Sequence, residues 1–250
     1  MNMSTPQTKP GSANRAAFPT THWSVVLAAG RERSPQGDAA LETLAQAYWY
    51  PIYAFLRREG YAQAEAQDLT QAFFARLLEK NYPAQADREK GRFRSFLLLT
   101  LRHFLSDTRE HATALKRGGG SVVLSLDEEV PEGRYRAEPA DLDTPETLFE
   151  RRWADTILER AKARQAGEYA ASGKAALYQV LQAFQPGEQK SLSYGQAAQH
   201  LATSENAVKT LIHRMRKRHQ ELVRDEIAQT VASAEDVDDE LRHLIAVLSR

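Results

Sequence analysis

Apolar residues recur along most of this chain at the three- and four-residue spacing that indicates amphipathic helices. A clear stripe lies in residues 63–80, at Ala66, Leu69, Phe73 and Leu77. The same spacing predicts further helices over 20–27, 39–58, 93–110, 145–158, 174–184, 194–201 and 204–227. Pro51 should break or kink the helix over 39–58. With at most one short strand, at 121–126, we expect an all-α protein.

Glycine and proline divide these predicted helices into two groups. The segment 116–143 contains three consecutive glycines and two prolines and has little helical period, which is typical of a linker. We therefore expect two small helical domains joined by a flexible linker. The predicted organisation is a disordered leader at 1–17, a first domain at 18–112, a linker at 113–144, a second domain at 145–228 and an acidic C-terminal helix at 229–250.

The C-terminal segment combines acidic residues with an apolar stripe. The stripe lies at Leu241, Leu244, Ile245 and Leu248. A helix this short is unstable alone, so it should dock on the protein. We expect it to pack on the second domain. A second hypothesis adds that docking brings the acidic residues close to the basic helix at 209–224, where they would compete with DNA phosphates.

Charge is balanced over the 250 residues, but it is unevenly distributed. Two basic segments, 88–117 and 209–224, are each followed by an acidic stretch, which favours a polyanionic partner over a uniformly solvated surface. No apolar run approaches the roughly 18 residues of a membrane span, and the first residues carry no secretory signal. We therefore expect a cytoplasmic protein with no membrane partner.

Residues that could support catalysis do not form a recognisable constellation. The chain has no cysteine, which excludes disulfides, zinc fingers and thiol nucleophiles. Its histidines never show the two-histidine spacing of a zinc protease, and Gly173-Lys174 lacks the remainder of a phosphate-binding loop. The acidic residues at 236–239 lack the glycine and spaced glutamate of a calcium loop. We expect no enzyme activity, no cofactor and no metal site.

The strongest local signal is a predicted helix-turn-helix over 193–222. Ala197 and Ala198 are small enough to let two helices cross closely, and Ser204 can cap the second helix. In such a motif the second helix enters the major groove. Its candidate DNA contacts are Glu205, Asn206, Lys209, Thr210, His213, Arg214 and, farther along, Arg218. An ordinary helical hairpin with a solvated basic face is the alternative.

Three stretches, in this order, resemble bacterial RNA polymerase sigma factors of the extracytoplasmic-function (ECF) type. They are Ala66–Phe73, then Gly91–Leu97 with His103 and Asp107, then Ser193–Arg216. The resemblance implies a first domain like the sigma region-two bundle and a second like the region-four helix-turn-helix. It also implies a function, which is to bind core RNA polymerase and to direct promoter recognition and transcription initiation.

The resemblance assigns roles to individual residues. Asp68 and Gln71 match positions on the helix that docks on the clamp helices of the polymerase β′ subunit. The segment that melts and reads the minus-ten element is matched by Arg92, Arg94, Phe96, Arg102 and His103. The helix that reads the minus-thirty-five element is matched by Lys209, His213 and Arg214. The β flap, promoter DNA and an anti-sigma protein complete the set of candidate partners.

Two other kinds of binding protein fit the same patterns. One is a helix-turn-helix transcriptional regulator whose N-terminal helical domain senses a ligand or a protein. The other is a helical adaptor that binds only protein. Co-purification with core polymerase favours a sigma factor, whereas a dimer on a palindromic site favours the regulator.

Overall fold

The computed structural model describes residues 22, 35–79, 92–114, 135, 144–185, 192–231 and 233–249. Almost all of these residues are helical and none lies in a strand, which confirms the all-α class. The helices are α2 (Pro35–Arg58), α3 (Gln63–Glu79), α4 (Phe93–Ala114), α6 (Pro145–Ala171), α7 (Ala175–Leu181), the 3-10 turn η3 (Gln182–Phe184), α8 (Tyr194–His200), α9 (Glu205–Ala228) and α10 (Ala234–Leu248). None of them is long and apolar enough to cross a membrane.

Local sequence signals explain where several helices begin. The Thr144 side chain accepts a hydrogen bond from the Thr147 amide, and Pro145 occupies the first turn of α6, as expected for a cap followed by proline. The sequence predicts either a break or a kink at Pro51. No break occurs, since α2 continues as one helix through this residue. Buried aromatic residues on both sides of Pro51, Trp49 and Tyr53 among them, hold the two halves in one core.

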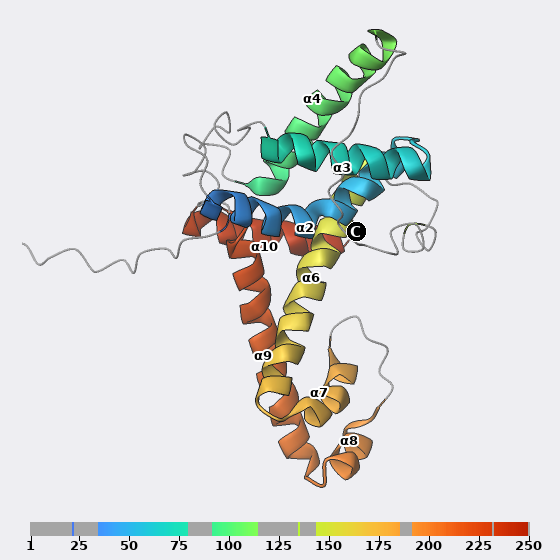
Figure 1. Cartoon of the computed structure of the whole chain (residues 1–250). Helices are drawn as coiled ribbons and strands as arrows, with labels where there is room; N and C mark the ends of the chain where they lie inside the picture. Colours follow the sequence, from blue (N-terminus) through green and yellow to red (C-terminus); the bar gives the residue numbers. More distant parts are fainter. Residues whose placement is uncertain are drawn as a thin grey trace, which may run out of the picture.

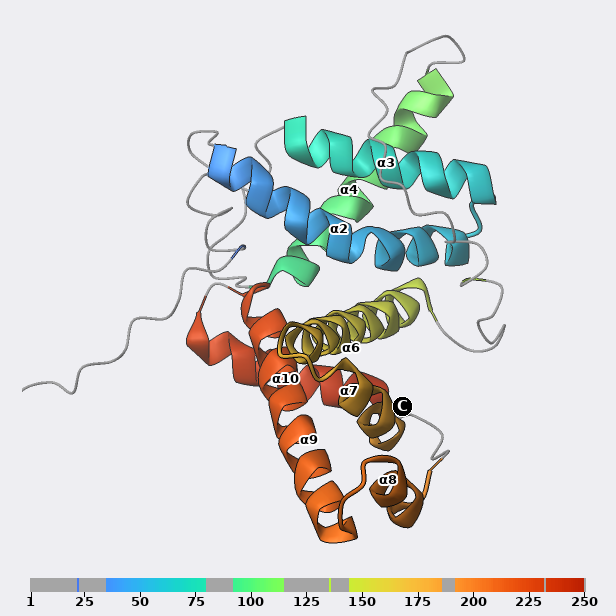
Figure 2. The same cartoon turned by 60° about the horizontal axis from the view of Figure 1, so that its bottom comes forward.

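Two hydrophobic clusters organise the molecule. The larger one joins α2, α3 and α4 with the first half of α6, the end of α9 and α10. The smaller one joins α7, η3, α8 and the first half of α9. α6 and α9 lie side by side and run from the first cluster to the second, so that α7 and α8 lie at the end of the molecule away from α4 (Figures 1 and 2).

Polar contacts tie α6 to α9 along their length. Glu226 is buried on α9 and accepts hydrogen bonds from Arg160 at 3.0 Å and Arg164 at 2.7 Å, both on α6. Farther along, the buried Gln165 side chain donates to the Met215 carbonyl at 2.7 Å. Buried polar groups require such partners, so these contacts fix the register of the two helices.

The sequence predicts that the second domain begins at residue 145, but the first half of α6 packs with the helices of the predicted first domain. Phe149 and Trp153 are fully buried in the larger cluster, where Phe149 stacks against Tyr48 of α2 at a ring distance of 6.3 Å. The hydrophobic core therefore continues past the expected boundary. Most of the predicted linker at 113–144, the leader at 1–17 and the short strand at 121–126 lie outside the described residues, as does the helix at 20–27 apart from His22.

α10 packs on α6 and α9, two helices of the segment predicted as the second domain, and its apolar residues lie in the larger cluster. Its buried apolar residues are Val237, Leu244 and Val247. The predicted stripe is therefore only partly correct: Leu244 is buried, whereas Ile245 and Leu248 are 56% and 46% exposed. The buried face of α10 is therefore rotated away from the predicted stripe. It includes Glu240, one turn before Leu244.

Candidate nucleic-acid interface

The α8–α9 pair has the local construction that the sequence predicts for a helix-turn-helix. Ala197 and Ala198 of α8 are buried against Val208 and Ile212 of α9. Ser193 and Gln196 form a reciprocal capping box at the start of α8. The Ser204 side chain caps α9 by accepting from the Ala207 amide at 3.2 Å. These contacts define where the exposed start of α9 points.

The turn between the two helices contains a strained residue. Ala202 has a φ of +48°, in the left-handed region that costs an L-residue about 1–2 kcal/mol. The neighbouring Thr203 amide is satisfied by the Ala198 carbonyl at 2.9 Å. The tight turn keeps the beginning of α9 close to α8.

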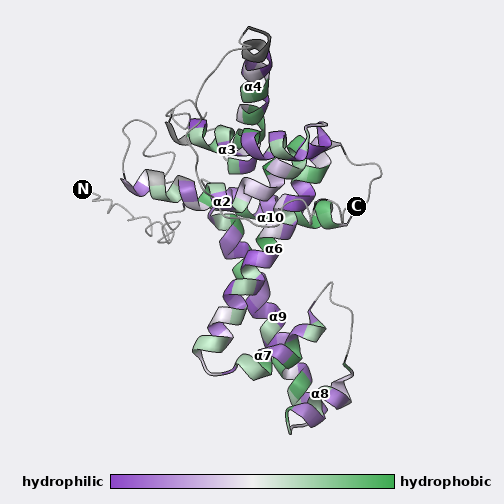
Figure 3. Cartoon of the chain, turned by 45° about the vertical axis from the view of Figure 1, so that its right-hand side comes forward, coloured by the Kyte–Doolittle hydropathy of each residue, from purple (hydrophilic) through white to green (hydrophobic). Residues whose placement is uncertain are grey.

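The start of α9 is polar and exposed, and it lies next to α8 at the end of the molecule shown at the bottom of Figure 3. The exposed residues include all six predicted at the start of α9: Glu205, Asn206, Lys209, Thr210, His213 and Arg214. The Lys209 ammonium lies 5.5 Å from the centroid of the Tyr194 ring, which orients it without neutralising it. Within the described part of the chain, Lys209 and Arg214 have no ion pair with a carboxylate. We call these six residues the recognition face.

The basic residues that follow the recognition face make internal contacts. Arg216 donates to the Phe184 carbonyl through two nitrogens, at 3.0 and 2.5 Å. Arg218 forms a bidentate contact with Glu168 of α6, at 2.6 and 2.9 Å, and a further bond to Glu221. The hydrogen bonds from Arg218 lower the pKa of the Glu168 carboxyl. Arg218, predicted as a DNA contact, therefore has a competing intramolecular partner.

The polar face of α3 is exposed as the sequence predicts. Asp68 is exposed and Gln71 is half-buried, while Ala66, Phe73 and Leu77 point into the larger cluster. Within the described residues, the Asp68 carboxylate makes no hydrogen bond or ion pair. Intramolecular packing therefore does not account for the identity of Asp68.

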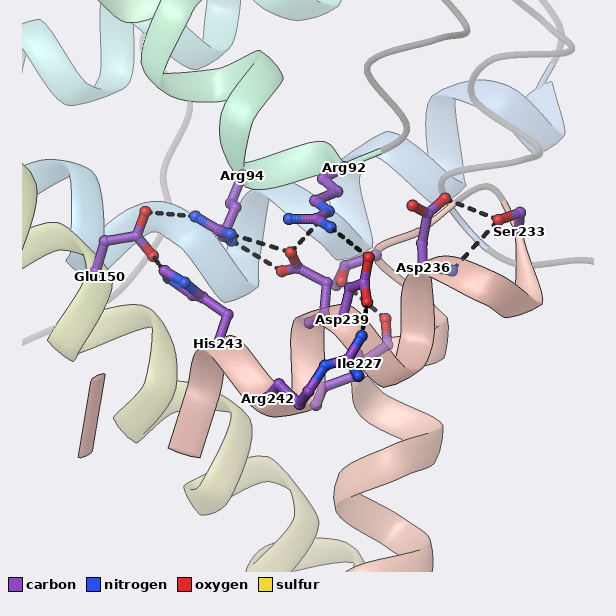
Figure 4. Close-up of polar contacts among 11 residues, drawn as sticks. Arg92, Arg94, Glu150, Ile227, Ser233, Asp236, Asp239, Arg242 and His243 are labelled. Carbon is purple, nitrogen blue, oxygen red and sulfur yellow. Dashed lines mark hydrogen bonds and ion pairs between the residues drawn. The ribbon is translucent and has the colours of Figure 1, made fainter. Parts of the chain in front are cut away.

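The five residues predicted to read the minus-ten element do not form one surface. His103 is exposed, Phe96 is half-buried, and Arg102 is exposed beside Glu146 of α6 at 2.5 Å. The hydrogen bond from Arg102 lowers the pKa of the Glu146 carboxyl. Arg92 and Arg94, in contrast, face α10 at the start of α4 (Figure 4).

Arg94 lies in the most buried ion-pair network of the described chain. Its guanidinium binds both oxygens of Glu240, at 2.8 and 3.0 Å, and one oxygen of Glu150 at 2.5 Å. It also lies 5.3 Å from the centroid of the Trp153 ring. The Arg94 and Glu240 side chains are only 8% and 1% exposed. In this conformation Arg94 therefore cannot contact DNA directly, because α10 covers its side chain.

Neighbouring groups complete this network, which joins α4, α6 and α10. Arg92 binds Asp239 at 3.2 Å and Glu240 at 3.1 Å, and His243 contacts Glu150 at 2.8 Å. Burial disfavours the charge of Arg94, but the hydrogen bonds that it donates to Glu240 and the negative charges of Glu150 and Glu240 raise the pKa of the guanidinium overall.

The roles of Glu150 and Glu240 were not predicted from the sequence. Glu240 carries a signal that could have identified it, because it lies three residues after Val237 and four before Leu244, on the face of α10 that is buried. A charged residue in the middle of an apolar face requires a partner of opposite charge. The spacing gives no indication that this partner is Arg94, 146 residues earlier in the chain.

A groove of about 980 Å³ lies between α6, α9 and α10. The exposed Ile245 and Leu248 line it, together with basic and acidic residues such as Lys217 and Glu159. Burial, and then the charge of Lys162, lower the pKa of His219 at its edge. Within the described residues, no group of three or more histidine, aspartate or glutamate side chains is placed to hold a metal ion.

The described surfaces contain two arginine-bearing regions, one open at the start of α9 and one covered at the start of α4. The recognition face offers amide, hydroxyl, imidazole and guanidinium groups, all of which can bond to base edges or phosphates. Comparison with protein-family models, with curated proteins and with solved structures finds no match to this chain.

Proposed function

We propose that the protein is a sigma factor of the ECF type, which binds core RNA polymerase and directs promoter recognition and transcription initiation. In this proposal the polar face of α3 contacts the clamp helices of the β′ subunit. The α8–α9 pair binds the minus-thirty-five element, and the exposed part of α4 takes part in opening the minus-ten element.

The observation that carries the proposal is the exposure of two separate polar faces that the fold itself does not use. Asp68 is exposed on α3, whose apolar side packs in the larger cluster. The recognition face lies on α9 at the opposite end of the molecule, beside the smaller cluster. A protein that contacts polymerase with one face and upstream DNA with the other requires this separation. A simple helical adaptor has no need for an exposed set of base-compatible side chains at the start of a capped helix.

Retention of core polymerase tests the proposal directly. The purified full-length chain should retain core RNA polymerase in a pull-down, and Asp68→Arg should reduce that retention at least about tenfold, because it reverses the charge at the centre of the contact. The matched control is Glu42→Arg, which makes the same change at an exposed position of α2. Circular dichroism should show that both variants remain folded.

The opposite outcome identifies a different protein. If the wild-type chain retains no core polymerase, or if both variants retain it equally well, the sigma assignment is wrong. A dimer bound to a palindromic duplex would then support the helix-turn-helix regulator.

A further inference from the structure

α10 supplies Arg92 and Arg94 with the same kind of partner that nucleic acid would supply. Arginine binds carboxylate and phosphate through the same two-pronged geometry. Glu240 occupies both prongs of Arg94 and also reaches Arg92, while Asp239 takes a further nitrogen of Arg92 (Figure 4). Both arginines are thus neutralised by residues of one short helix near the end of the chain.

The attachment of α10 to the rest of the fold would allow its carboxylates to be replaced on the two arginines by another anion. The helix follows a turn at 229–230, where the Phe93 amide of α4 donates to the Thr230 carbonyl at 3.0 Å. Movement at this turn would carry Asp239 and Glu240 away together, because both lie on α10. Arg94 would retain Glu150 of α6, and Arg92 would lose both of its recorded carboxylate partners.

We propose that α10 is an autoinhibitory helix whose Asp239 and Glu240 carboxylates stand in for nucleic-acid phosphates on Arg92 and Arg94. This inference rests on the proposed function, because it adds regulation to the surface that the sigma assignment gives to the minus-ten element. Nucleic acid binds the two arginines only after α10 moves off the start of α4. The free protein therefore binds DNA mainly through the recognition face.

The same geometry restricts where the inhibition acts. The recorded ion pair between α10 and the basic part of α9 joins Asp238 to Arg224 at 2.6 Å, with both side chains at least half exposed. Arg224 lies more than two helical turns beyond Arg214, so the recognition face is uncovered. The autoinhibitory helix thus acts on the start of α4, and not on the start of α9.

The test compares two variants of the full-length chain that each remove one negative charge from α10. Glu240→Gln removes the negative charge that Arg92 and Arg94 share, whereas Glu235→Gln changes an exposed residue in the first turn of the same helix. The probe is a fluorescein-labelled single-stranded DNA oligonucleotide, and its affinity is measured by anisotropy over a range of salt concentrations.

Glu240→Gln should bind the oligonucleotide about tenfold more tightly than the wild type at low salt, and Glu235→Gln should bind as the wild type does. The slope of log affinity against log salt should be steeper in Glu240→Gln by up to about 1.4, because each arginine that becomes available to a single strand adds about 0.7. Adding Arg92→Gln to Glu240→Gln should remove about half of that extra slope. Equal affinities in the two single variants would overturn the proposal.

Hydrogen exchange distinguishes an exchangeable helix from a purely structural ion pair. In the wild type, a saturating concentration of oligonucleotide should increase exchange in residues 234–248 and decrease it at the start of α4. Unchanged exchange in α10 while DNA is bound to α4 would also overturn the proposal.

Failure of this inference can be separated from failure of the proposed function. If core polymerase is retained but Glu240→Gln gains no affinity, α10 is structural and the sigma assignment is unaffected. If Glu240→Gln gains affinity and α10 opens while no core polymerase is retained, the autoinhibitory helix is correct and the protein is a nucleic-acid-binding protein of another kind.

Discussion

The start of α4 and the start of α9 carry the same kinds of basic residue, but the fold treats them in opposite ways. At the start of α4, Arg92 and Arg94 are held by carboxylates from α6 and α10, and Arg94 is buried. At the start of α9, Lys209 and Arg214 are exposed without an ion-pair partner in the described chain. A basic residue in the sequence is therefore a candidate contact only until its neighbours in space are known.

The basic residues at the start of α4 and at the start of α9 should also differ in what they contribute to, the former to folding stability and the latter to DNA binding. Removing one partner of a buried ion pair leaves an uncompensated charge and is strongly destabilising, whereas an exposed cation contributes little to folding. Substitutions at the start of α4 should therefore change the free energy of unfolding, and substitutions at the start of α9 should change only DNA affinity. The predictions below test this distinction.

The largest effect is expected at Arg94. Arg94→Ala removes both hydrogen bonds that Arg94 donates to the buried Glu240 carboxylate and leaves it only the partly exposed Arg92, so the free energy of unfolding should fall by up to about 3–5 kcal/mol. Urea denaturation followed by circular dichroism measures it. Arg102→Ala is the control, because its pair with Glu146 is exposed and should contribute about 0–1 kcal/mol. Similar losses in both variants would mean that burial does not distinguish the two arginines.

A smaller effect, on binding alone, is expected at the recognition face. Arg214→Ala or Lys209→Ala should weaken binding to a selected duplex by about 1–3 kcal/mol if the side chain contacts a base edge, with the unfolding midpoint unchanged. Arg216→Ala is a useful contrast, since its bonds to the Phe184 carbonyl predict a loss of stability instead. Unchanged transcription and duplex affinity in both recognition-face variants would exclude this face as the upstream reader.

The smallest effect is expected at the Glu168–Arg218 pair. The pKa of Glu168 is lower in the folded state than its ordinary value of 4.5. Its contribution to stability is therefore present above the unfolded-state pKa and is lost as the pH falls through the folded-state pKa. Because the pair is exposed, Glu168→Gln should cost about 0–1 kcal/mol at neutral pH, with the difference from the wild type vanishing in acid.

The same variant has a second readout that bears on the comparison. Glu168→Gln frees Arg218 from its bidentate partner, so duplex affinity should rise modestly and with a steeper salt dependence. A reduced affinity would show that Arg218 positions α9 rather than contacting phosphate.

The sequence by itself determined those features that depend on neighbouring residues. Helical spacing gave the all-α class, and the predicted cap at Ser204 begins α9. Thr144 and Ser193 are local caps of the same kind at the start of α6 and α8. The exposed faces of α3 and α9 could be read because each lies opposite an apolar stripe on its own helix. Within one helix, the period of 3.6 residues fixes which side chains share a face.

Only the tertiary structure decided which helices share a core and which charges meet. The packing of α6 on α2 and the rotation of α10 depend on contacts between segments far apart in the chain. Arg94 and Glu240 are 146 residues apart, and each resembles an ordinary surface charge in its own segment. Their burial follows from the way α4, α6 and α10 meet, because a charge can be removed from water only where its partners are already in place.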